Sequence, residues 1–256
     1  MPEKILIVQT AFIGDIVLTT PLIKAVKEIY PGSKLSFLTT PKGKDLMEDI
    51  EELDEIIAYD KKRGDKGIIG LIKLVRALRT RGFDLSLAPH QSHRTALMLF
   101  LAGIPLRVGY EESSLSFLYN RKVHWEPKIH QVERAMLLLE ALEEGGKNSR
   151  KPYLSVSPAV EQEAQGILEQ AGIKESDLVV GVSPGSVWAT KRWTPKGYGE
   201  LITQLSKVYG AKVLILGGID DREVVKEVMF HCEVESFDPA TGGAQDMVQS
   251  AIYRDD

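Results

Sequence analysis

Residues Lys4–Val26 read KILIVQTAFIGDIVLTTPLIKAV. The β-branched run KILIVQ is typical of a buried strand, and the amphipathic segment that begins near Thr20 is typical of a helix. Pro21 fits the first turn of this helix, because a proline there loses no hydrogen bond. Between strand and helix, Gly14 permits a sharp turn of the backbone. This stretch therefore predicts a strand, a loop and a helix, which form the first part of a βαβ unit.

The same alternation continues through the first half of the chain. Short apolar runs occur at KLSFLT, EIIAYD, DLSLAP and RVGY, and amphipathic stretches such as GLIKLVRALRTRG and HQVERAMLLLEALEEG lie between or after them. Repeated βαβ units form a parallel sheet with helices on both faces. Because glycine favours helix termination, we expect one helix to end near Arg81 and the long one to end at Gly145–Gly146. A further helix is expected over His93–Ala102.

A second series of βαβ elements follows the polar stretch KNSRKP and a helix predicted near Val160 to Ala171. Its segments are LVVGVSP, GYGELITQLSKVYG, KVLILGG and DREVVKEVMF. After Cys232 the pattern weakens to one short candidate strand and one weak helix. We therefore expect an α/β protein with two domains, residues 1–150 and 151–256, the second with an incomplete sheet.

The composition excludes several classes of protein. The chain has 256 residues, of which 43% are hydrophobic and 27% are charged, as in ordinary globular proteins. The net charge of −4 argues against nucleic acid as a partner. No apolar run approaches the roughly 20 residues that span a bilayer, and the N-terminus MPEKILIVQT lacks signal-peptide features, so we expect a cytoplasmic protein. A single cysteine, Cys232, excludes an internal disulfide and a cysteine-based zinc cluster.

Asp15 is the candidate for acid–base chemistry in the first loop. It follows a strand that should end at the ligand-binding edge of the sheet, where a carboxylate can act as a general base towards a sugar hydroxyl. The alternative is a helix-capping aspartate that accepts backbone N–H bonds. The loop lacks the GxGxxG fingerprint, which argues against a nicotinamide-dependent oxidoreductase.

The segment SPGSVWATKRWTPKGYGELI places Ser183–Gly185 at a strand end and Lys191 shortly before a helix. A cation beside a helix N-terminus offers charge and backbone donors to a diphosphate, although a solvated Lys-Arg pair is the alternative. In LILGGIDDREVV, Asp220, Asp221 and Glu223 can hydrogen-bond ribose hydroxyls. They can equally complement the dipole of the helix that they begin.

Cations form a third group of candidate residues. We expect Arg76 to Arg81 to be solvated residues of a helix surface. Cations predicted in loops can hold the phosphate groups of an acidic acceptor. These candidate acceptor-binding residues are Lys61, Arg63, His90 and Arg94.

Several of these segments together resemble the lipopolysaccharide heptosyltransferase family. They are KILIVQTAFIGDIVLTTPLIKAV, PHQSHRTALMLFLAGIPLRVGY, HQVERAMLLLEAL, PGSVWATKRWTPKGYGELI and LILGGIDDRE, and they extend to about Glu223. The resemblance implies a GT-B architecture of two Rossmann-like domains. The N-terminal domain would bind the acceptor and the C-terminal domain the nucleotide sugar.

The family's reaction implies a role for individual residues. Asp15 looks like the base that activates the acceptor hydroxyl, and Lys191 looks like the cation that binds the donor diphosphate. Transfer would invert the anomeric centre without a metal or other cofactor. The donor-binding residues implied are Ser183, Gly185, Thr190, Lys191 and Glu223.

The resemblance implies transfer of heptose from ADP-heptose to the inner core or lipid A of lipopolysaccharide, at the inner face of the inner membrane. The chain departs from the family where an Asp followed by Ser or Thr, Gly and His is expected. The segment ATGGAQDMVQ has no histidine and the wrong order. We therefore expect roughly the last quarter to third of the family chain to be missing or replaced. A non-catalytic binding remnant is the alternative function.

Overall fold

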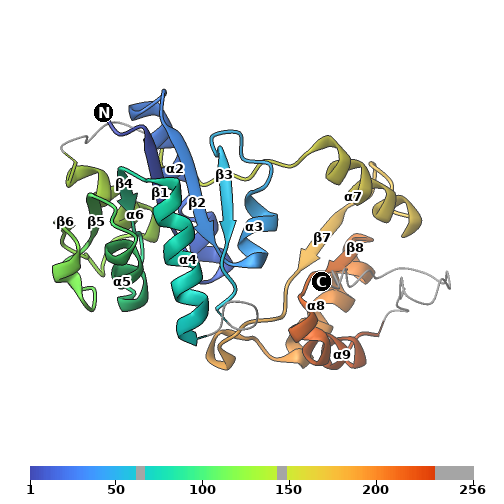
Figure 1. The fold of residues 1–256 in the computed structure, drawn as a ribbon. Helices are drawn as coiled ribbons and strands as arrows, with labels where there is room; N and C mark the ends of the chain where they lie inside the picture. Colours follow the sequence, from blue (N-terminus) through green and yellow to red (C-terminus); the bar gives the residue numbers. More distant parts are fainter. Residues whose placement is uncertain (62–66, 143–148, 234–256) are drawn as a thin grey trace. The chain divides into compact units, whose positions relative to one another are not determined.

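The computed structural model describes residues 1–61, 67–142 and 149–233. The chain divides into two compact units, Met1–Ser157 and Pro158–Asp256. Figure 1 shows a parallel sheet with helices in the first unit and a smaller group of strands and helices in the second. The predicted domain boundary lies after residue 150, and the division between the units falls after Ser157.

The sheet of the first unit has six strands, and every adjacent pair is parallel. Their order is β3-β2-β1-β4-β5-β6. The chain therefore moves outward from β1 in one direction and then restarts at β4 on the other side. The carboxyl ends of β1 and β4 form the topological switch point, where open parallel sheets bind ligands. The strands are β1 (Lys4–Val8), β2 (Lys34–Thr39), β3 (Glu55–Ala58), β4 (Leu85–Leu87), β5 (Leu106–Tyr110) and β6 (Arg121–Val123).

The helices of this unit follow the predicted order, with differences at their ends. The prediction that a helix ends at Arg81 is confirmed, and Gly82 then has φ 66°. The prediction that the long helix reaches Gly145–Gly146 is wrong: it ends at Glu140, and that pair lies outside the described residues. The helices are α1 (Ile13–Val17), α2 (Thr20–Ile29), α3 (Pro41–Met47), α4 (Gly67–Arg81), α5 (His93–Leu101) and α6 (Gln131–Glu140), with a 3-10 turn η1 (Ser116–Leu118).

Alternate residues of β1 belong to two separate cores. Ile5 and Ile7 pack with α2 and α6, whereas Leu6 and Val8 pack with α4 and α5. All four side chains are fully buried, and each buried aliphatic side chain contributes about 1.5 to 3 kcal/mol. The prediction of helices on both faces is therefore confirmed. Because both faces are covered, ligands have access to this sheet mainly at its edges and strand ends.

The second unit has a two-stranded parallel sheet among its described residues. Val182, Val213 and Ile215 from the sheet pack against Ile202 and Val225 from two helices. The α/β class and the prediction of a second, incomplete parallel sheet are confirmed. The elements are α7 (Pro158–Gln170), β7 (Val179–Val182), η2 (Ala189–Lys191), α8 (Pro195–Tyr209), β8 (Lys212–Ile215), η3 (Ile219–Asp221) and α9 (Arg222–Phe230).

None of the helices within residues 1–61, 67–142 and 149–233 has the length and apolar character needed to cross a bilayer.

A close approach of α3 fixes the position of the short helix α1. A Cβ atom added to Gly43 would overlap the Thr39 hydroxyl and lie 2.6 Å from Cδ1 of Ile16. Ile16 is fully buried and belongs to α1, which also contains Asp15. Glycine at position 43 therefore permits the packing that holds the candidate catalytic segment against the sheet.

We expect Gly43→Ala to destabilise the protein by about 1 to 3 kcal/mol, the usual cost of overpacking. Gly32→Ala is the matched control, because a Cβ there would have no neighbour within 4 Å. Denaturant unfolding of both variants measures the difference. A Gly43→Ala midpoint equal to that of Gly32→Ala would show that α1 and α3 can separate at no cost.

Candidate functional site

Side chains from two loops hold the strand ends together at the switch point of the first unit. Nζ of Lys61, which follows β3, donates to the Thr10 carbonyl after β1 at 3.1 Å. Nδ1 of His90, which follows β4, lies 3.1 Å from the Val8 carbonyl at the end of β1. Two of the predicted acceptor-binding residues therefore meet where the topology favours a ligand.

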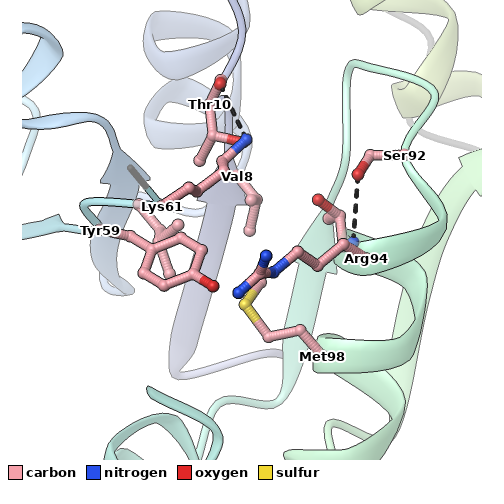
Figure 2. Close-up of a pocket in the computed structure, with 9 residues that line it drawn as sticks. Val8, Thr10, Tyr59, Lys61, Ser92, Arg94 and Met98 are labelled. Carbon is pink, nitrogen blue, oxygen red and sulfur yellow. Dashed lines mark hydrogen bonds between the residues drawn. The ribbon is translucent and has the colours of Figure 1, made fainter. Parts of the chain in front are cut away.

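A small pocket lies at this edge, as Figure 2 shows. Three polar atoms of its lining residues are buried without a hydrogen-bond partner in the described part of the chain: Thr10 Oγ1, Tyr59 Oη and Arg94 Nε. Buried polar groups are usually paired, so these atoms indicate the place of a polar ligand or water. The lining residues are Val8, Thr10, Leu38, Tyr59, Lys61, Ser92, Arg94, Thr95 and Met98.

The pocket is electropositive. Burial, and secondarily the charge of Arg94, lower the pKa of the Lys61 ammonium group. The guanidinium carbon of Arg94 lies 5.4 Å from the centre of the Tyr59 ring, which holds the cation in place. The residues that line the pocket include no Asp or Glu. Two neighbouring cations with donor groups around them favour an anionic oxygen group, whose binding would relieve their repulsion.

His90 lies next to this pocket and supports it through hydrogen bonds, but it does not line the pocket. The Val8 carbonyl can only accept, so Nδ1 carries the hydrogen and Nε2 accepts from the Thr95 hydroxyl at 3.1 Å. Burial, with a smaller effect of the Lys61 charge, lowers the pKa of His90 to about 4. The ring is therefore neutral at pH 7 and both nitrogens are engaged. A direct contact of His90 with an acceptor stays a prediction, and Arg63 lies outside the described residues.

Asp15 lies in the first turn of α1, directly after the β1 loop. The capping alternative is not what the structure shows, because Phe12 is the N-cap residue and no side chain caps the helix. The Asp15 carboxylate is partly exposed and forms no hydrogen bond or ion pair with any described residue. An unengaged carboxylate can accept a proton from a substrate, and its role as base stays a prediction.

A buried polar network that the sequence analysis missed supports the Asp15 segment. Gln9 is fully buried, accepts from the Ala11 amide at 3.2 Å and donates to Thr19 Oγ1 at 3.3 Å. The Thr19 hydroxyl donates in turn to the Asp15 carbonyl at 2.7 Å. A polar glutamine at the end of an otherwise apolar strand was the available signal, because a buried amide needs such partners.

The candidate donor site of the second unit lies where β7 and β8 end. Gly185 approaches Asp221 so closely that a Cβ atom at position 185 would overlap the carboxylate. Oδ2 of Asp221 also accepts from the Gly218 amide at 2.9 Å. Asp221 therefore connects the loop after β7 to the loop after β8. This contact explains the position of its side chain without a role in binding ribose.

The adjacent residues Lys191 and Arg192 have different environments. The Arg192 Nε donates to the Ser186 carbonyl at 2.7 Å and so closes the loop after β7. The Lys191 side chain is exposed and has no partner among the described residues, although its amide donates to the Trp188 carbonyl at 2.9 Å. The pair is thus not simply solvated: the arginine maintains the loop and leaves the lysine available to an anion.

The other predicted donor residues lie around this loop. Ser183 and Thr190 are exposed, as a ligand contact requires. Glu223 lies in the first turn of α9 and pairs with Lys226 of the same helix at 2.9 Å, and both side chains are exposed. Thr194 accepts from the Gly197 amide and starts α8, whose N-terminus therefore follows Lys191 closely. Contacts of all these residues with a donor stay predictions.

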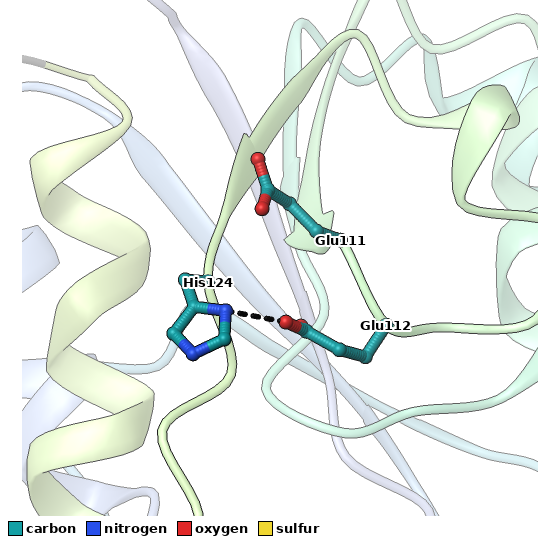
Figure 3. Close-up of side chains that lie close together, drawn as sticks. All are labelled: Glu111, Glu112 and His124. Atoms are coloured by element: carbon teal, nitrogen blue, oxygen red, sulfur yellow. Dashed lines mark ion pairs between the residues drawn. The ribbon is translucent and has the colours of Figure 1, made fainter.

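A separate cluster comprises Glu111, Glu112 and His124 after β5 and β6 (Figure 3). Their potential ligand atoms lie within 4.8 Å of one another, and all three residues are exposed. The Glu112 carboxylate already pairs with Nδ1 of His124 and accepts from the Trp125 amide at 2.8 Å. These contacts account for the positions of Glu112 and His124.

Comparison with known proteins assigns the class to which this fold and these strand-end sites belong. Residues 71–240 match glycosyltransferase family 9 (heptosyltransferase). The chain belongs to this family, which confirms the resemblance inferred from its motifs.

Among curated relatives, the chain is similar to lipopolysaccharide heptosyltransferase 2 of Escherichia coli K12, with 27% identity over 237 residues. This match covers 88% of the chain and 66% of the relative. The lipopolysaccharide core heptosyltransferase OpsX of Haemophilus influenzae is 21% identical, with coverage of 90% and 65%. The chain thus spans slightly less than two thirds of the length of these relatives.

Solved structures share the fold. A family 9 glycosyltransferase from Veillonella parvula has a TM-score of 0.82 at 23% identity, covering 91% of this chain and 67% of that one. ADP-heptose lps heptosyltransferase II of E. coli has a TM-score of 0.73 at 23% identity, covering 89% and 68%. The GT-B-like α/β fold of the chain is therefore established.

The low pKa of His90 predicts a dependence of stability on pH. The unfolded histidine titrates near 6.5 and the folded one near 4, so the unfolded state binds more protons between these values. The contribution is complete above about pH 6.5 and is lost as the pH falls towards 4, up to about 3 kcal/mol. His90→Gln should reduce the stability difference between pH 7 and pH 4.5, measured by denaturant unfolding.

The exposed His93 of α5 provides the matched control, because His93→Gln should leave the pH dependence as it is. If His90→Gln and His93→Gln lose stability equally on acidification, His90 is not the group responsible.

Proposed function

We propose that this protein is a glycosyltransferase that transfers heptose from ADP-heptose to the inner core of lipopolysaccharide. Family membership supports the class of reaction. The names of two relatives support the substrates, since one is a lipopolysaccharide heptosyltransferase and the structure of another, E. coli WaaC, is described with ADP-2-deoxy-2-fluoro heptose. That structure has a TM-score of 0.64 and 21% identity, and covers 88% of this chain and 72% of its own.

The observation that carries the proposal is Lys191, whose side chain has no partner among the described residues and which precedes the N-terminus of α8. Its ammonium group and the positive end of the α8 helix dipole would offer positive charge to the donor diphosphate. Ser183 and Thr190 would add hydroxyl contacts, and Gly185 would allow the backbone to approach the phosphates. Glu223 would bind the ribose after release from Lys226. These fixed groups would supply the charge that the leaving diphosphate requires, without a metal or other cofactor.

On the acceptor side, the cationic pocket of the first unit would hold an anionic group of the lipopolysaccharide core or lipid A. Lys61 and Arg94 supply the charge, Arg63 would extend it, and His90 keeps the pocket walls in place. Asp15 would take the proton from the acceptor hydroxyl as its oxygen attacks the anomeric carbon. The bond from this carbon to the diphosphate then breaks, ADP leaves, and the configuration inverts.

A second function from another class is a binding protein that holds the ligands and turns over little. The family match supports the enzyme over this alternative. Calorimetry with ADP and a transfer assay with ADP-heptose and a lipopolysaccharide acceptor separate the two. Binding with transfer supports the enzyme, and binding without transfer supports the alternative.

Asp15→Asn should lower the rate of transfer by about 10²-fold or more, because the amide cannot accept the proton. The free energy of unfolding should stay unchanged, since the carboxylate has no partner in the described structure. Asp45→Asn, at an exposed position of α3, is the control. Near-normal turnover of the Asp15→Asn variant would remove this residue from the mechanism.

Lys191→Ala should weaken ADP binding by about 1.5 to 3 kcal/mol, the value of a charged hydrogen bond. Lys196→Ala is the control, because Lys196 is an exposed cation on the neighbouring helix α8 that pairs with Glu200. Arg192→Ala should instead lower thermal stability, since it removes the bond to Ser186. Equal affinity for ADP in the parent and in Lys191→Ala would show that the lysine is only a surface charge.

A further inference from the structure

Helix α4 exposes large apolar side chains next to cations. Ile68, Ile69 and Ile72 are exposed by 75%, 71% and 44%, although isoleucine is normally buried. The exposed cations of the same helix are Lys73, Arg76 and Arg79, and α4 contains no Asp or Glu. On a chain of net charge −4, this is a local concentration of positive charge.

These residues occupy a single face of the helix. At about 100° per residue, the three isoleucines and the three cations fall within a sector of about 140°, shared only with Thr80. The opposite sector contains the buried Leu74 and Leu78. This surface is therefore exposed while the opposite side of the helix packs into the core. We call it the α4 face and define it as Ile68, Ile69, Ile72, Lys73, Arg76 and Arg79.

The first unit holds this face in a fixed orientation. Leu74 and Leu78 belong to the core that contains Leu6 and Val8 of β1. At the end of the helix, Arg81 donates three hydrogen bonds to the Glu55 carboxylate. Nε lies 2.9 Å from Oε1 and 3.1 Å from Oε2, and Nη2 lies 2.7 Å from Oε1. A helix anchored in this way keeps its exposed side chains in place, as a docking surface requires.

The α4 face adjoins the cationic pocket. The carbonyl of Gly67, the first residue of α4, accepts from NH2 of Arg94 at 3.0 Å. Gly67 immediately precedes Ile68 and Ile69, the apolar end of the face. The pocket and the apolar end are thus joined through a direct hydrogen bond within one unit.

We propose that the α4 face docks the protein on an anionic lipid bilayer, with the isoleucines at the acyl boundary and the cations at the headgroups. Interfacial helices combine apolar and basic residues in this way, and long basic side chains can reach the headgroups while their stems stay in contact with apolar atoms. A bilayer supplies the negative charge that the face lacks. This inference rests on the proposed function only where it names a lipid-linked acceptor, which docking would bring to the pocket.

The size of the face argues against a second copy of the chain. The helix has 15 residues and is about 22 Å long and about 10 Å wide, whereas a stable interface covers about 800 Å² on each partner. Three cations without a carboxylate would also repel those of an identical face. A bilayer has neither restriction, because it is extended and complementary in charge.

Vesicle flotation with the full chain tests the proposal. The probes are vesicles of phosphatidylcholine alone and of equal parts phosphatidylcholine and phosphatidylglycerol. The parent protein should float with the anionic vesicles and be released by salt. Arg76→Gln combined with Arg79→Gln should weaken partitioning about fivefold for each cation removed. Ile68→Ser, Ile69→Ser and Ile72→Ser combined should weaken it by more than about tenfold.

The matched controls are Lys196→Gln and Val208→Ser, which change an exposed cation and a 69% exposed apolar residue of the second unit. They should partition as the parent does. Equal flotation of parent and α4 variants overturns the proposal, as does equal binding to both kinds of vesicle. A change of elution volume in the α4 variants without vesicles would assign the face to self-association and also overturn it.

ADP calorimetry on the same samples separates this proposal from the proposed function. If an α4 variant no longer floats with the vesicles but binds ADP as the parent does, the defect lies in the α4 face and not in the donor site. Flotation without ADP binding in the parent would instead contradict the donor site and leave the docking surface supported.

Discussion

At the switch point, the Val8 carbonyl at the end of β1 has a side chain as its hydrogen-bond partner. His90 supplies it through Nδ1 and then accepts from Thr95 through Nε2. This requires a neutral ring, which burial and the charge of Lys61 both favour. The neutral histidine therefore adds no third positive charge beside Lys61 and Arg94. His90, which follows β4, thereby connects the end of β1 to α5 beside the pocket.

The same division between supporting and available groups recurs in the second unit. Arg192 is committed to the Ser186 carbonyl and Asp221 to the Gly218 amide, so neither is the best candidate for a ligand contact. Lys191 remains without a partner within the described residues. A guanidinium with a fixed planar set of donors suits the closing of a loop, whereas an ammonium on a flexible stem suits a phosphate that arrives from solvent. The identities of the two adjacent cations thus match their different environments.

Most of the fold could be predicted from the sequence, because buried parallel strands and amphipathic helices leave strong periodic signals. The run KILIVQ and the stop at Gly82 are examples. The strand β6 was missed because Arg121–Val123 offers three residues and two of them are exposed cations. The early end of α6 at Glu140 was also missed, since the following residues still favour a helix by propensity.

The loops that form the candidate site could be predicted from the sequence, but the contacts of their side chains could not. Sequence position grouped Lys61 and Arg94 as candidate acceptor-binding cations, and the structure places both in the lining of one pocket. Tyr59 and Thr10 gave no signal, because the sequence does not show which hydroxyl groups lack a partner after folding. The roles of Lys191 and Arg192 were likewise indistinguishable, because only the Ser186 contact separates them. The pattern of polar and apolar residues does not indicate which of two adjacent cations forms a structural hydrogen bond.

Charge distribution gives a reason why the first unit would suit a lipid-linked anionic acceptor. The chain is acidic overall, yet both the pocket and the α4 face exclude acidic side chains and share the contact between Arg94 and Gly67. In the proposed mode of binding, an acceptor carried by a bilayer would meet the protein in two places, with its headgroup at Arg94 and its membrane at Ile68. Each contact raises the effective concentration of the other, so two individually weak interactions suffice where a soluble acceptor would need one strong site. The small volume of the pocket is then no obstacle, because it needs to recognise only one anionic group of a large substrate.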